Sequence, residues 1–491
     1  METFEITGVE PQFRLNEGQQ RAFDSLCDFL GGKRRVFILK GFAGTGKTTM
    51  MRFLVDELKS RNMPYRLLAP TGRAAKVLSS LSHDGNQAAN TIHKMIFNLK
   101  GLNETDGGQT GIEASGQMYL VFEACKRQAD APAMVYIVDE ASMIADEEVT
   151  EVTQAKFGSG KLLTELLDYD HNPESKFIFV GDPCQLPPVG QYQSPALSRE
   201  YFSSHFGIDA QECRLTQIMR QANGSSLVDV SMRLRSLWKF APAEESYYGR
   251  QKVWSKLPFR GCGDIEFHRS MDEMVELYAR QFQSQGPDHS IIICMSNKAC
   301  LETSQKVRSL LGRRSLSVER GDLLMVVQNN LLVPLANGDM VTVTEVTHET
   351  QYIANLLFRK VKVKDVSTGV THETWLIEDV LTQSAPNLSK QQQSALFRDF
   401  IVRMKDKGID KDSYQFMDEM QSDPFMNALR CNWGYAVTCQ KSQGGEWDEV
   451  MLATPRNITL NPTKGKYQWL YTALTRARKR VHVADDFFYS Y

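Results

Sequence analysis

The chain has 491 residues, with 57 lysine and arginine residues against 59 aspartate and glutamate residues, so its formal net charge is −2. Apolar residues make up 42% of the chain and charged residues 24%, which is typical of a folded globular protein and excludes a disordered chain. The length predicts about three domains, and the near-zero charge excludes a protein that coats nucleic acid through bulk electrostatics, but not one with a local basic groove.

The longest apolar runs, such as IIICM at 291–295, are far shorter than the roughly 18 residues of a membrane span, so we expect no membrane partner. The amino terminus carries Glu2 and Glu5 and no apolar stretch, so no secretory signal is predicted. Nine cysteines without a Cys-x-x-Cys pair favour free thiols in a reducing compartment. We therefore expect a cytoplasmic location, at the nucleoid in a bacterium, with a nuclear location left open.

The first half of the chain alternates short apolar runs with helical patterns. Residues 34–41 predict a buried strand that ends in glycine, and the apolar spacing after it predicts a helix. Further strands are predicted at 65–70, 134–140 and 176–182. Such alternation predicts a parallel sheet covered on both faces. Residues 101–118 are polar and glycine-rich, and predict a loop or hairpin inserted between two core strands.

The second half restarts the α/β pattern. Residues 288–311 predict a strand that leads into a helix. From about 320 to 380, short apolar runs with turn signals predict a small all-β insert, in which Asn337-Gly338 is a good hairpin turn. Residues 385–428 are polar and helical in pattern. The fold class predicted is therefore α/β, with two units that each carry an insertion.

A phosphate-binding motif stands at 41–49, GFAGTGKTT, after a predicted strand and before a predicted helix. Glycines let backbone N–H groups curl around phosphate oxygens, and the helix N-terminus adds partial positive charge. Lys47 would neutralise the β- and γ-phosphates, and the Thr48 hydroxyl would ligate Mg²⁺. The predicted nucleotide contacts in this loop are Gly41, Gly44, Thr45, Gly46, Lys47, Thr48 and Thr49.

Two adjacent carboxylates end the predicted strand at 134–140. Asp139 suits a Mg²⁺ contact, and Glu140 suits the orientation or deprotonation of an attacking water. An acid pair at a strand end is a weak signal alone, because many such acids are only solvated. Downstream of a full phosphate-binding motif, it indicates a nucleotide-hydrolysing site with ATP and Mg²⁺ as cofactors.

Six further motifs follow at 69–76 (APTGRAAK), 90–94 (NTIHK), 179–189 (FVGDPCQLPPV), 215–221 (LTQIMRQ), 436–450 (AVTCQKSQGGEWDEV) and 471–478 (YTALTRAR). Together with the motifs above, they resemble superfamily-one helicases of the 5′-to-3′ branch, within the RecD, Dda and Pif-type group. The resemblance covers about residues 13–485. It implies two RecA-like P-loop domains with ATP in the cleft between them.

The resemblance assigns further roles at the nucleotide. Gln185 lines the γ-phosphate, while Arg220 and Arg476 stabilise the charge that develops on the transferred phosphoryl group. An ion pair at the surface is the alternative for either arginine. Since Arg476 comes from the second unit, catalysis would require the two units to close. The remaining nucleotide contacts assigned in this way are Gln19 at the adenine edge, Gln443 and Gly444.

The resemblance also implies a track for a nucleic-acid strand across both units, with contacts from Pro70, Thr71, His93, Asn297 and Thr438. Short polar groups suit phosphate contacts, which position a strand without reading its sequence. A hydrogen-bonded histidine at a helix start is the alternative for His93. The chain has Gln440 where the family usually has histidine, so a contact there would carry no charge.

Two inserted modules complete the expected organisation. Phe122, at the end of MYLVF, is a candidate for base stacking or a wedge, although the alternating pattern fits an ordinary core residue equally well. The segment at 320–384 resembles the small β-barrel that these helicases carry in their second domain. The expected boundaries are 1–98 and 133–218 for the first RecA-like domain, 99–132 for a wedge or hairpin module, 219–319 and 429–491 for the second RecA-like domain, 320–384 for the barrel and 385–428 for a helical segment.

The sequence therefore predicts an ATP- and Mg²⁺-dependent DNA helicase that moves 5′-to-3′ on single-stranded DNA. Single strands and junctions with duplex are the expected partners, and a monomer is expected by resemblance. An RNA-directed helicase is one alternative, because phosphate contacts alone do not separate DNA from RNA. Another alternative is a P-loop switch that does not unwind nucleic acid. The motifs at 69–76, 90–94 and 436–450 argue against this alternative.

Overall fold

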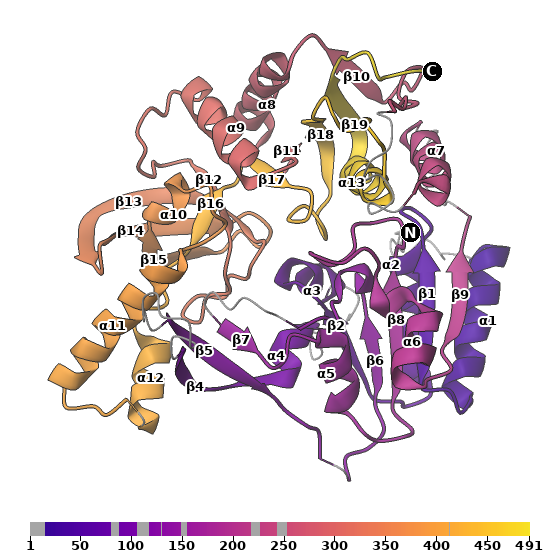
Figure 1. The fold of residues 1–491 in the computed structure, drawn as a ribbon, viewed down its shortest axis with the longest axis horizontal. Coiled ribbons are helices and arrows are strands. Elements are labelled where there is room, and N and C mark those ends of the chain that lie inside the picture. Colours follow the sequence, from indigo (N-terminus) through magenta and orange to yellow (C-terminus); the bar gives the residue numbers. More distant parts are fainter. Residues whose placement is uncertain are drawn as a thin grey trace, which may run out of the picture.

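The computed structural model describes residues 15–79, 88–105, 117–128, 130–148, 155–217, 226–242, 253–411 and 413–491. These residues form two α/β units, each built on a parallel sheet and each joined to smaller β and helical elements (Figure 1). Within the described ranges, no helix is both long and apolar enough to cross a membrane.

The first unit is built on a six-stranded sheet in which every pairing is parallel. Its strand order is β3-β2-β6-β8-β1-β9. The strands are β1 (Val36–Gly41), β2 (Tyr65–Ala69), β3 (Asn90–Thr91), β6 (Val135–Val138), β8 (Lys176–Gly181) and β9 (Gln211–Leu215). The four strands predicted in this half are confirmed, each to within two residues at its ends.

Helices cover both faces of this sheet. They are α1 (Glu17–Gly31), α2 (Lys47–Ser60), α3 (Gly72–Ser79), α4 (Ile92–Ile96), α5 (Leu162–Tyr169) and α6 (Arg199–Phe206), with short 3₁₀ turns η1 (Ala141–Met143) and η2 (Pro195–Leu197). Successive side chains of β1 point to opposite faces. Phe37 and Leu39 join the core formed with α1, α2 and α3, whereas Val36 and Ile38 join the core formed with α4, α5 and α6. The predicted two-sided burial is confirmed.

The second unit has a five-stranded parallel sheet of order β10-β19-β18-β11-β17. Its strands are β10 (Ile265–His268), β11 (Ser290–Cys294), β17 (Ala436–Thr438), β18 (Trp447–Leu452) and β19 (Ala477–Ala484). Its helices are α7 (Leu227–Phe240), α8 (Met271–Gln285), α9 (Asn297–Leu310) and α13 (Lys464–Leu474). The strand and helix predicted at 288–311 are confirmed by β11 and α9.

The insertion in the first unit contains two long strands. β4 (Phe97–Thr105) pairs antiparallel with β5 (Gln117–Ala124), which pairs parallel with β7 (Ala155–Phe157). The glycine-rich centre of this insertion, at 106–116, lies outside the described residues. The described part agrees with a hairpin.

The insertion in the second unit is an antiparallel sheet of order β15-β14-β13-β12-β16. Its strands are β12 (Leu323–Val326), β13 (Met340–Ile353), β14 (Leu356–Asp365), β15 (Thr371–Ile377) and β16 (Cys431–Trp433). Asn337-Gly338 does form a turn, because Asp339 N donates to Ala336 O at 3.0 Å. It is not a two-residue hairpin connection, since the chain between β12 and β13 is longer and Leu335 is buried in the core.

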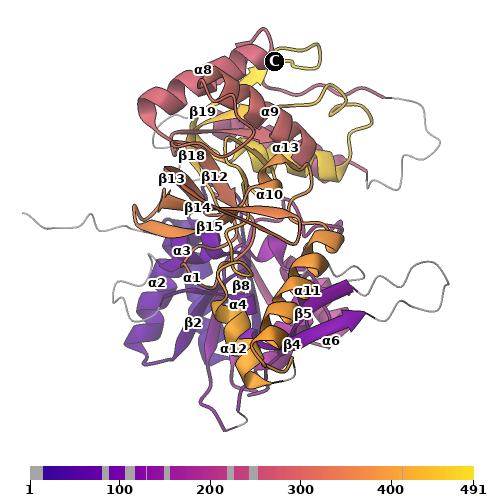
Figure 2. The same cartoon turned by 90° about the vertical axis from the view of Figure 1, so that its left-hand side faces the viewer.

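The helices α10 (Asp379–Thr382), α11 (Lys390–Asp406) and α12 (Tyr414–Ser422) follow this sheet, as the pattern at 385–428 predicts for the last two. Helix α11 contacts β5 of the first insertion (Figure 2). Leu99 and Leu120 pack against the apolar cluster that contains Phe397 and Phe400. The two insertions therefore touch each other, away from the two parallel sheets.

Candidate active site between the two units

The phosphate-binding loop joins the end of β1 to the start of α2. Gly44 and Gly46 have φ values of 75° and 83°, in the left-handed region that favours glycine. A Cβ at Gly41 would lie 2.8 Å from both Lys47 Cγ and Thr45 Oγ1, so the loop closes tightly on itself. Lys47 Nζ donates to Gly41 O at 2.8 Å and Phe42 O at 3.2 Å. Thr48 is exposed in the first turn of α2, and Thr49 beside it is half-buried.

Gln19 lies against this loop from the first turn of α1. Its side chain forms a capping box with Asn16, in which Asn16 N donates to Gln19 Oε1 at 3.1 Å. The other end of the amide, Nε2, donates to Thr45 O at 3.2 Å. The buried Gln19 thus fixes the start of α1 to the phosphate-binding loop, and its contact with an adenine edge stays a prediction.

The acid pair follows β6 at the carboxyl edge of the same sheet. Glu140 has φ 50° and ψ 38°, a left-handed conformation that is costly for a residue with a side chain and is often found at functional sites. Burial and the neighbouring Glu140 carboxylate raise the pKa of Asp139, while Lys47 opposes the shift. Lys47 and Asp139, which are some ninety residues apart in sequence, are therefore close enough to interact.

Gln185 links the acid pair to the second unit. With its amide nitrogen facing the carboxylate, it donates to Glu140 Oε2 at 3.2 Å and accepts from Arg476 Nη2 at 2.9 Å. Arg476 is buried, and its guanidinium also donates to Thr472 O at 3.1 Å and Gly445 O at 3.3 Å. A buried arginine with these partners excludes the surface ion pair that was the alternative for this residue. The predicted Glu140, Gln185 and Arg476 form one hydrogen-bonded chain across the cleft.

Tyr471 is a site residue that the sequence analysis missed. Its hydroxyl donates to Asp182 Oδ2 at 2.7 Å and accepts from Ala43 N at 3.0 Å, so α13 contacts both the phosphate-binding loop and the segment after β8. Burial and the Asp182 carboxylate raise the pKa of the Tyr471 hydroxyl well above its usual range. Both residues stand in motifs at 179–189 and 471–478, but nothing in their spacing indicates that they meet.

Other polar groups reinforce the same contact. Leu186 N donates to Thr472 Oγ1 at 2.9 Å, and Gln468 Nε2 donates to Gln185 O at 3.1 Å. Gln443, assigned to the nucleotide, donates instead to Leu186 O at 3.3 Å and is buried. Gly444 has φ 73° and packs beside Ala74 of α3. The loop after β17 therefore contacts the first unit directly, and a contact of its residues with nucleotide stays a prediction.

A second arginine lies over the phosphate-binding loop. The guanidinium carbon of Arg235, on α7, is 3.9 Å from the centroid of the Phe42 ring. Its Nη1 is buried without a hydrogen-bond partner among the described residues. Arg220, which was predicted to contact the transferred phosphoryl group, lies outside the described residues. The sequence analysis did not single out Arg235, because it belongs to none of the motifs.

The predicted strand contacts of the first unit lie at the ends of β2 and β3. Pro70 and Thr71 join β2 to α3, and Thr71 Oγ1 accepts from Ala74 N at 3.2 Å. His93 is half-buried in α4, with its ring 5.0 Å from that of Phe157, and burial lowers its pKa to about 4. A neutral histidine at this place can contact a phosphate by a hydrogen bond but not by charge.

Phe122 belongs to the same aromatic cluster. It lies opposite Phe157 in the β5–β7 pair, with ring centroids 4.5 Å apart and planes inclined by 20°. Phe122 packs against the core of the first unit that contains Ile92 and Phe97. This geometry favours the core interpretation of Phe122, because one face of its ring is already covered.

Two of the three predicted contacts of the second unit meet in one pocket. Asn297, at the start of α9, and Thr438, at the end of β17, both line it, together with Lys441. Lys441 Nζ donates to Asn432 Oδ1 at 2.8 Å, and burial lowers its pKa. Gln440 is exposed and is not among the residues that line the pocket. A helix N-terminus, a hydroxyl and an ammonium group in one hollow suit the binding of a phosphate.

Helix α3 makes a second contact between the units. Lys76 Nζ lies 2.5 Å from Asp339 Oδ2 and 3.1 Å from Asp365 Oδ2, and both carboxylates belong to the β-rich insertion. Burial opposes the charged form, but hydrogen bonds to the two carboxylates raise the pKa of Lys76. The Arg73 guanidinium lies 4.6 Å from the Trp447 ring centroid. Gly72 is packed so closely that an added Cβ would lie 2.3 Å from Ala336 Cβ.

A phosphate-binding loop, an acid pair and an arginine supplied from a second parallel-sheet unit define a two-unit P-loop nucleotide-binding protein. Known families agree with this class. A family model described as "AAA domain" matches residues 14–237, and one described as "UvrD-like helicase C-terminal domain" matches residues 433–484. The ATP-dependent DNA helicase dda of Enterobacteria phage T4 is 28% identical over 498 residues, covering 95% of this chain and 98% of the relative.

The ATP-dependent RecD2 DNA helicase of Deinococcus radiodurans is 28% identical over 218 residues, covering 44% of this chain and 24% of the relative. A crystal structure of Pif1 helicase from Bacteroides in complex with ADP-AlF3 and ssDNA has 17% identity and a TM-score of 0.47, and the match covers 97% of this chain and 93% of that one. The chain spans 35% and 38% of the length of two other curated relatives, from Acanthamoeba polyphaga mimivirus and Methanocaldococcus jannaschii. These matches make the chain similar to the superfamily-one helicases of the RecD, Dda and Pif-type group.

Proposed function

We propose that this protein is an ATP-driven DNA helicase that moves 5′-to-3′ on single-stranded DNA and separates duplex at a junction. The observation that carries the proposal is the chain of hydrogen bonds from Glu140 through Gln185 to Arg476. A hydrolytic group from one unit and a charge-stabilising group from the other are joined by a single amide. Hydrolysis therefore depends on how the two units sit, which is the requirement for turning ATP turnover into movement.

The residues of the cleft fit the parts that phosphoryl transfer needs. The loop N–H groups and Lys47 bind the β- and γ-phosphates, and Glu140 takes a proton from the water that attacks the γ-phosphorus. As the bond to the bridging oxygen breaks, Arg476 stabilises the charge on the phosphoryl group. Gln185 orients the water and transmits the presence of the γ-phosphate to the second unit. Arg220 is proposed to act beside Arg476.

The oxygen donors for Mg²⁺ would be Thr48 and Asp139. Burial and the adjacent Glu140 carboxylate raise the pKa of Asp139, and a divalent cation relieves this kind of electrostatic setting. When bound, Mg²⁺ supplies positive charge next to the phosphates. Gln19 is proposed to contact the adenine edge, and Gln443 and Gly444 to approach the nucleotide when the cleft closes.

The strand is proposed to run from Pro70, Thr71 and His93 in the first unit to Asn297, Thr438 and Gln440 in the second. The pocket that holds Asn297 and Thr438 supports the second half of this track, because its polar groups suit a phosphate without reading a base. We also propose that the sheet β12–β16 acts as the small barrel of the group, with β16 (Cys431–Trp433) added to the predicted segment 320–384 and the other domain boundaries as predicted. The protein is further proposed to work as a monomer.

The test is ATP hydrolysis with and without single-stranded DNA, followed by unwinding of partial duplexes that carry a 5′ or a 3′ tail. We expect strong stimulation by the single strand and unwinding only with the 5′ tail. Unwinding only with the 3′ tail would overturn the direction. Stimulation by RNA alone would favour the RNA-directed alternative, and hydrolysis that no nucleic acid changes would favour a switch.

A further inference from the structure

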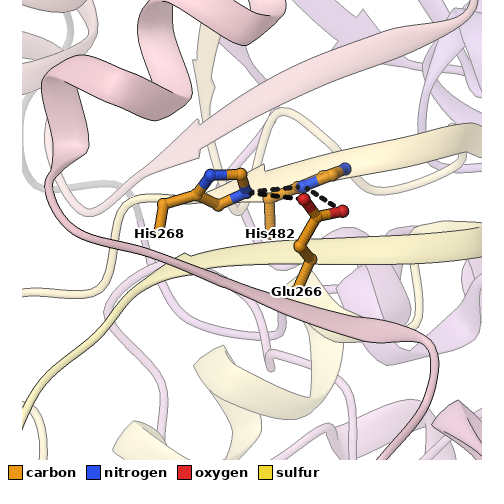
Figure 3. Close-up of side chains that lie close together, drawn as sticks. All are labelled: Glu266, His268 and His482. Carbon is orange, nitrogen blue, oxygen red and sulfur yellow. Dashed lines mark hydrogen bonds and ion pairs between the residues drawn. The ribbon is translucent and has the colours of Figure 1, made fainter.

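Three side chains that could bind a metal gather at the edge of the second sheet, on the strands β10 and β19 (Figure 3). Glu266 and His268 are two residues apart on β10, so they project from the same face. His482 lies directly opposite Glu266 in the parallel register of β10 and β19. None of the three belongs to the motifs of the nucleotide cleft or to the predicted strand contacts.

The distances between the three possible ligand atoms suit a tetrahedral ion. His268 Nε2 lies 2.9 Å from His482 Nδ1, and Glu266 oxygens lie 3.9 Å from the first nitrogen and 3.7 Å from the second. Ligands about 2.0–2.1 Å from a tetrahedral Zn²⁺ are about 3.3–3.4 Å from one another. The site would form if the two imidazole rings moved apart by a few tenths of an ångström and the Glu266 carboxylate moved closer to them by a similar amount.

A second carboxylate, that of Glu449, orients the His482 ring through its other nitrogen, Nε2. His482 Nε2 lies 2.8 Å from Glu449 Oε2, and Gln281 Nε2 donates to the same oxygen at 2.5 Å. With its proton on Nε2 and directed to Glu449, His482 presents the Nδ1 lone pair to His268 and Glu266. A carboxylate that holds the outer nitrogen of a ligating histidine is the usual support of a zinc site.

The cluster is closed on the protein side and open on the solvent side. The side chains of His268 and His482 are 8% and 1% exposed, whereas that of Glu266 is 48% exposed. A cation already neighbours the carboxylate, because Arg480 Nη1 lies 3.5 Å from Glu266 Oε2. Arg480 is itself half exposed, so it can move into solvent when an ion binds.

We propose that Glu266, His268 and His482 form a binding site for Zn²⁺, with Glu449 as the positioning residue and a water in the fourth place. Two imidazoles and one carboxylate are a ligand set typical of zinc. The ion would tie the edge strand β10 to β19, the strand that begins directly after Arg476. The site stabilises the second unit and is independent of ATP hydrolysis.

The test is a titration of the full chain, freed of metal by a chelator, with Co²⁺ as a spectroscopic probe and then with Zn²⁺. We expect one Co²⁺ per chain with the strong visible bands of a four-coordinate site, and loss of those bands when Zn²⁺ displaces it. Zn²⁺ should also raise the midpoint of thermal unfolding. Because Glu266 is half exposed, Glu266→Gln should fold normally and lose both responses.

Further variants separate this site from adventitious binding. Glu449→Gln should weaken Co²⁺ binding by about 10- to 100-fold while leaving the band shape unchanged. Arg480→Gln, which removes the competing cation, should tighten binding several-fold. His348→Gln, a change of an exposed strand histidine elsewhere, should have no effect. Absence of four-coordinate Co²⁺ bands in the unaltered chain, or their persistence in both Glu266→Gln and His268→Gln, would overturn the proposal.

Discussion

Two of the contacts between the units are built from different chemistry. The nucleotide-side contact, formed by Gln185, Arg476, Tyr471 and their partners, is a network of buried hydrogen bonds. The α3-side contact, formed by Arg73 and Lys76 with the second unit and its insertion, is an ion pair and a cation–π contact. In the ion pair, the lysine side chain is 33% exposed while both carboxylates are 3% exposed.

This difference suggests that the two contacts serve different tasks, hydrolysis of ATP and movement along the strand. The nucleotide-side contact includes a group of the phosphate-binding loop itself, the Ala43 N–H. The α3-side contact contains no group of the nucleotide site, and it joins the segment after the predicted strand contacts Pro70 and Thr71 to the β-rich insertion. We therefore expect changes at the first contact to affect hydrolysis, and changes at the second to affect movement along the strand.

The largest effect should come from Lys47→Ala. Removal of the ammonium group leaves the phosphate charge unbalanced in the loop, so ATP hydrolysis should be abolished. Phosphate release with single-stranded DNA measures the effect, and Lys33→Ala, at an exposed position, is the control. A variant that hydrolyses ATP within a factor of a few of the unaltered rate would contradict the site assignment.

Arg476→Ala should have the second largest effect. We expect ATP turnover to slow by roughly 10³ or more while nucleotide binding stays nearly intact. The reason is that the guanidinium acts on charge that develops only during transfer. Stopped-flow binding of a fluorescent nucleotide should be compared with steady-state hydrolysis. Arg478→Ala, at a half-exposed residue in the same motif, provides the control. Loss of nucleotide binding in Arg476→Ala would count against the proposed role.

Tyr471→Phe tests the network with a smaller change. It removes only a hydroxyl but leaves Ala43 N and Asp182 Oδ2 each without that partner, which costs about 1–3 kcal/mol. We expect kcat/KM for ATP to fall by about tenfold, since 1.4 kcal/mol is a factor of ten. Tyr352→Phe, at an exposed position, should change nothing. An unchanged kcat/KM in Tyr471→Phe would show that the network is not coupled to catalysis.

Lys76→Met should have the smallest effect on ATP turnover, and it should show the clearest difference between the nucleotide-side and α3-side contacts. The two carboxylates that it faces lose their cation, so the α3-side contact should weaken by about 1–2 kcal/mol, less than for a fully buried pair. Unwinding per ATP should fall while hydrolysis stimulated by the single strand is largely kept. Lys298→Met, an exposed lysine next to Asn297, is the control. An equal loss of both activities would remove the distinction between the two contacts.

Local sequence was enough for much of the site. The phosphate-binding loop is a strand, a glycine-rich turn and a helix start within nine residues, so its geometry follows from residues that are neighbours in the chain. Asp139 and Glu140 follow a strand whose apolar run is readable by itself. A turn is present at Asn337-Gly338, because a turn depends on a few adjacent residues, but it does not directly join two paired strands as a hairpin turn would. Its docking beside Gly72 and Lys76 could not be predicted, because it depends on how distant segments pack.

By itself, the sequence determined the α/β units, the nucleotide loop, the acid pair and the resemblance to a helicase family, since each rests on contiguous spacing or on the order of motifs. Tertiary structure alone decided that Gln185 joins Glu140 to Arg476, that Tyr471 reaches Ala43, and that Phe122 packs against Phe157. It also brought Glu266, His268 and His482 together at a sheet edge. Such contacts join residues far apart in the chain, and only strand order and register determine which of them meet.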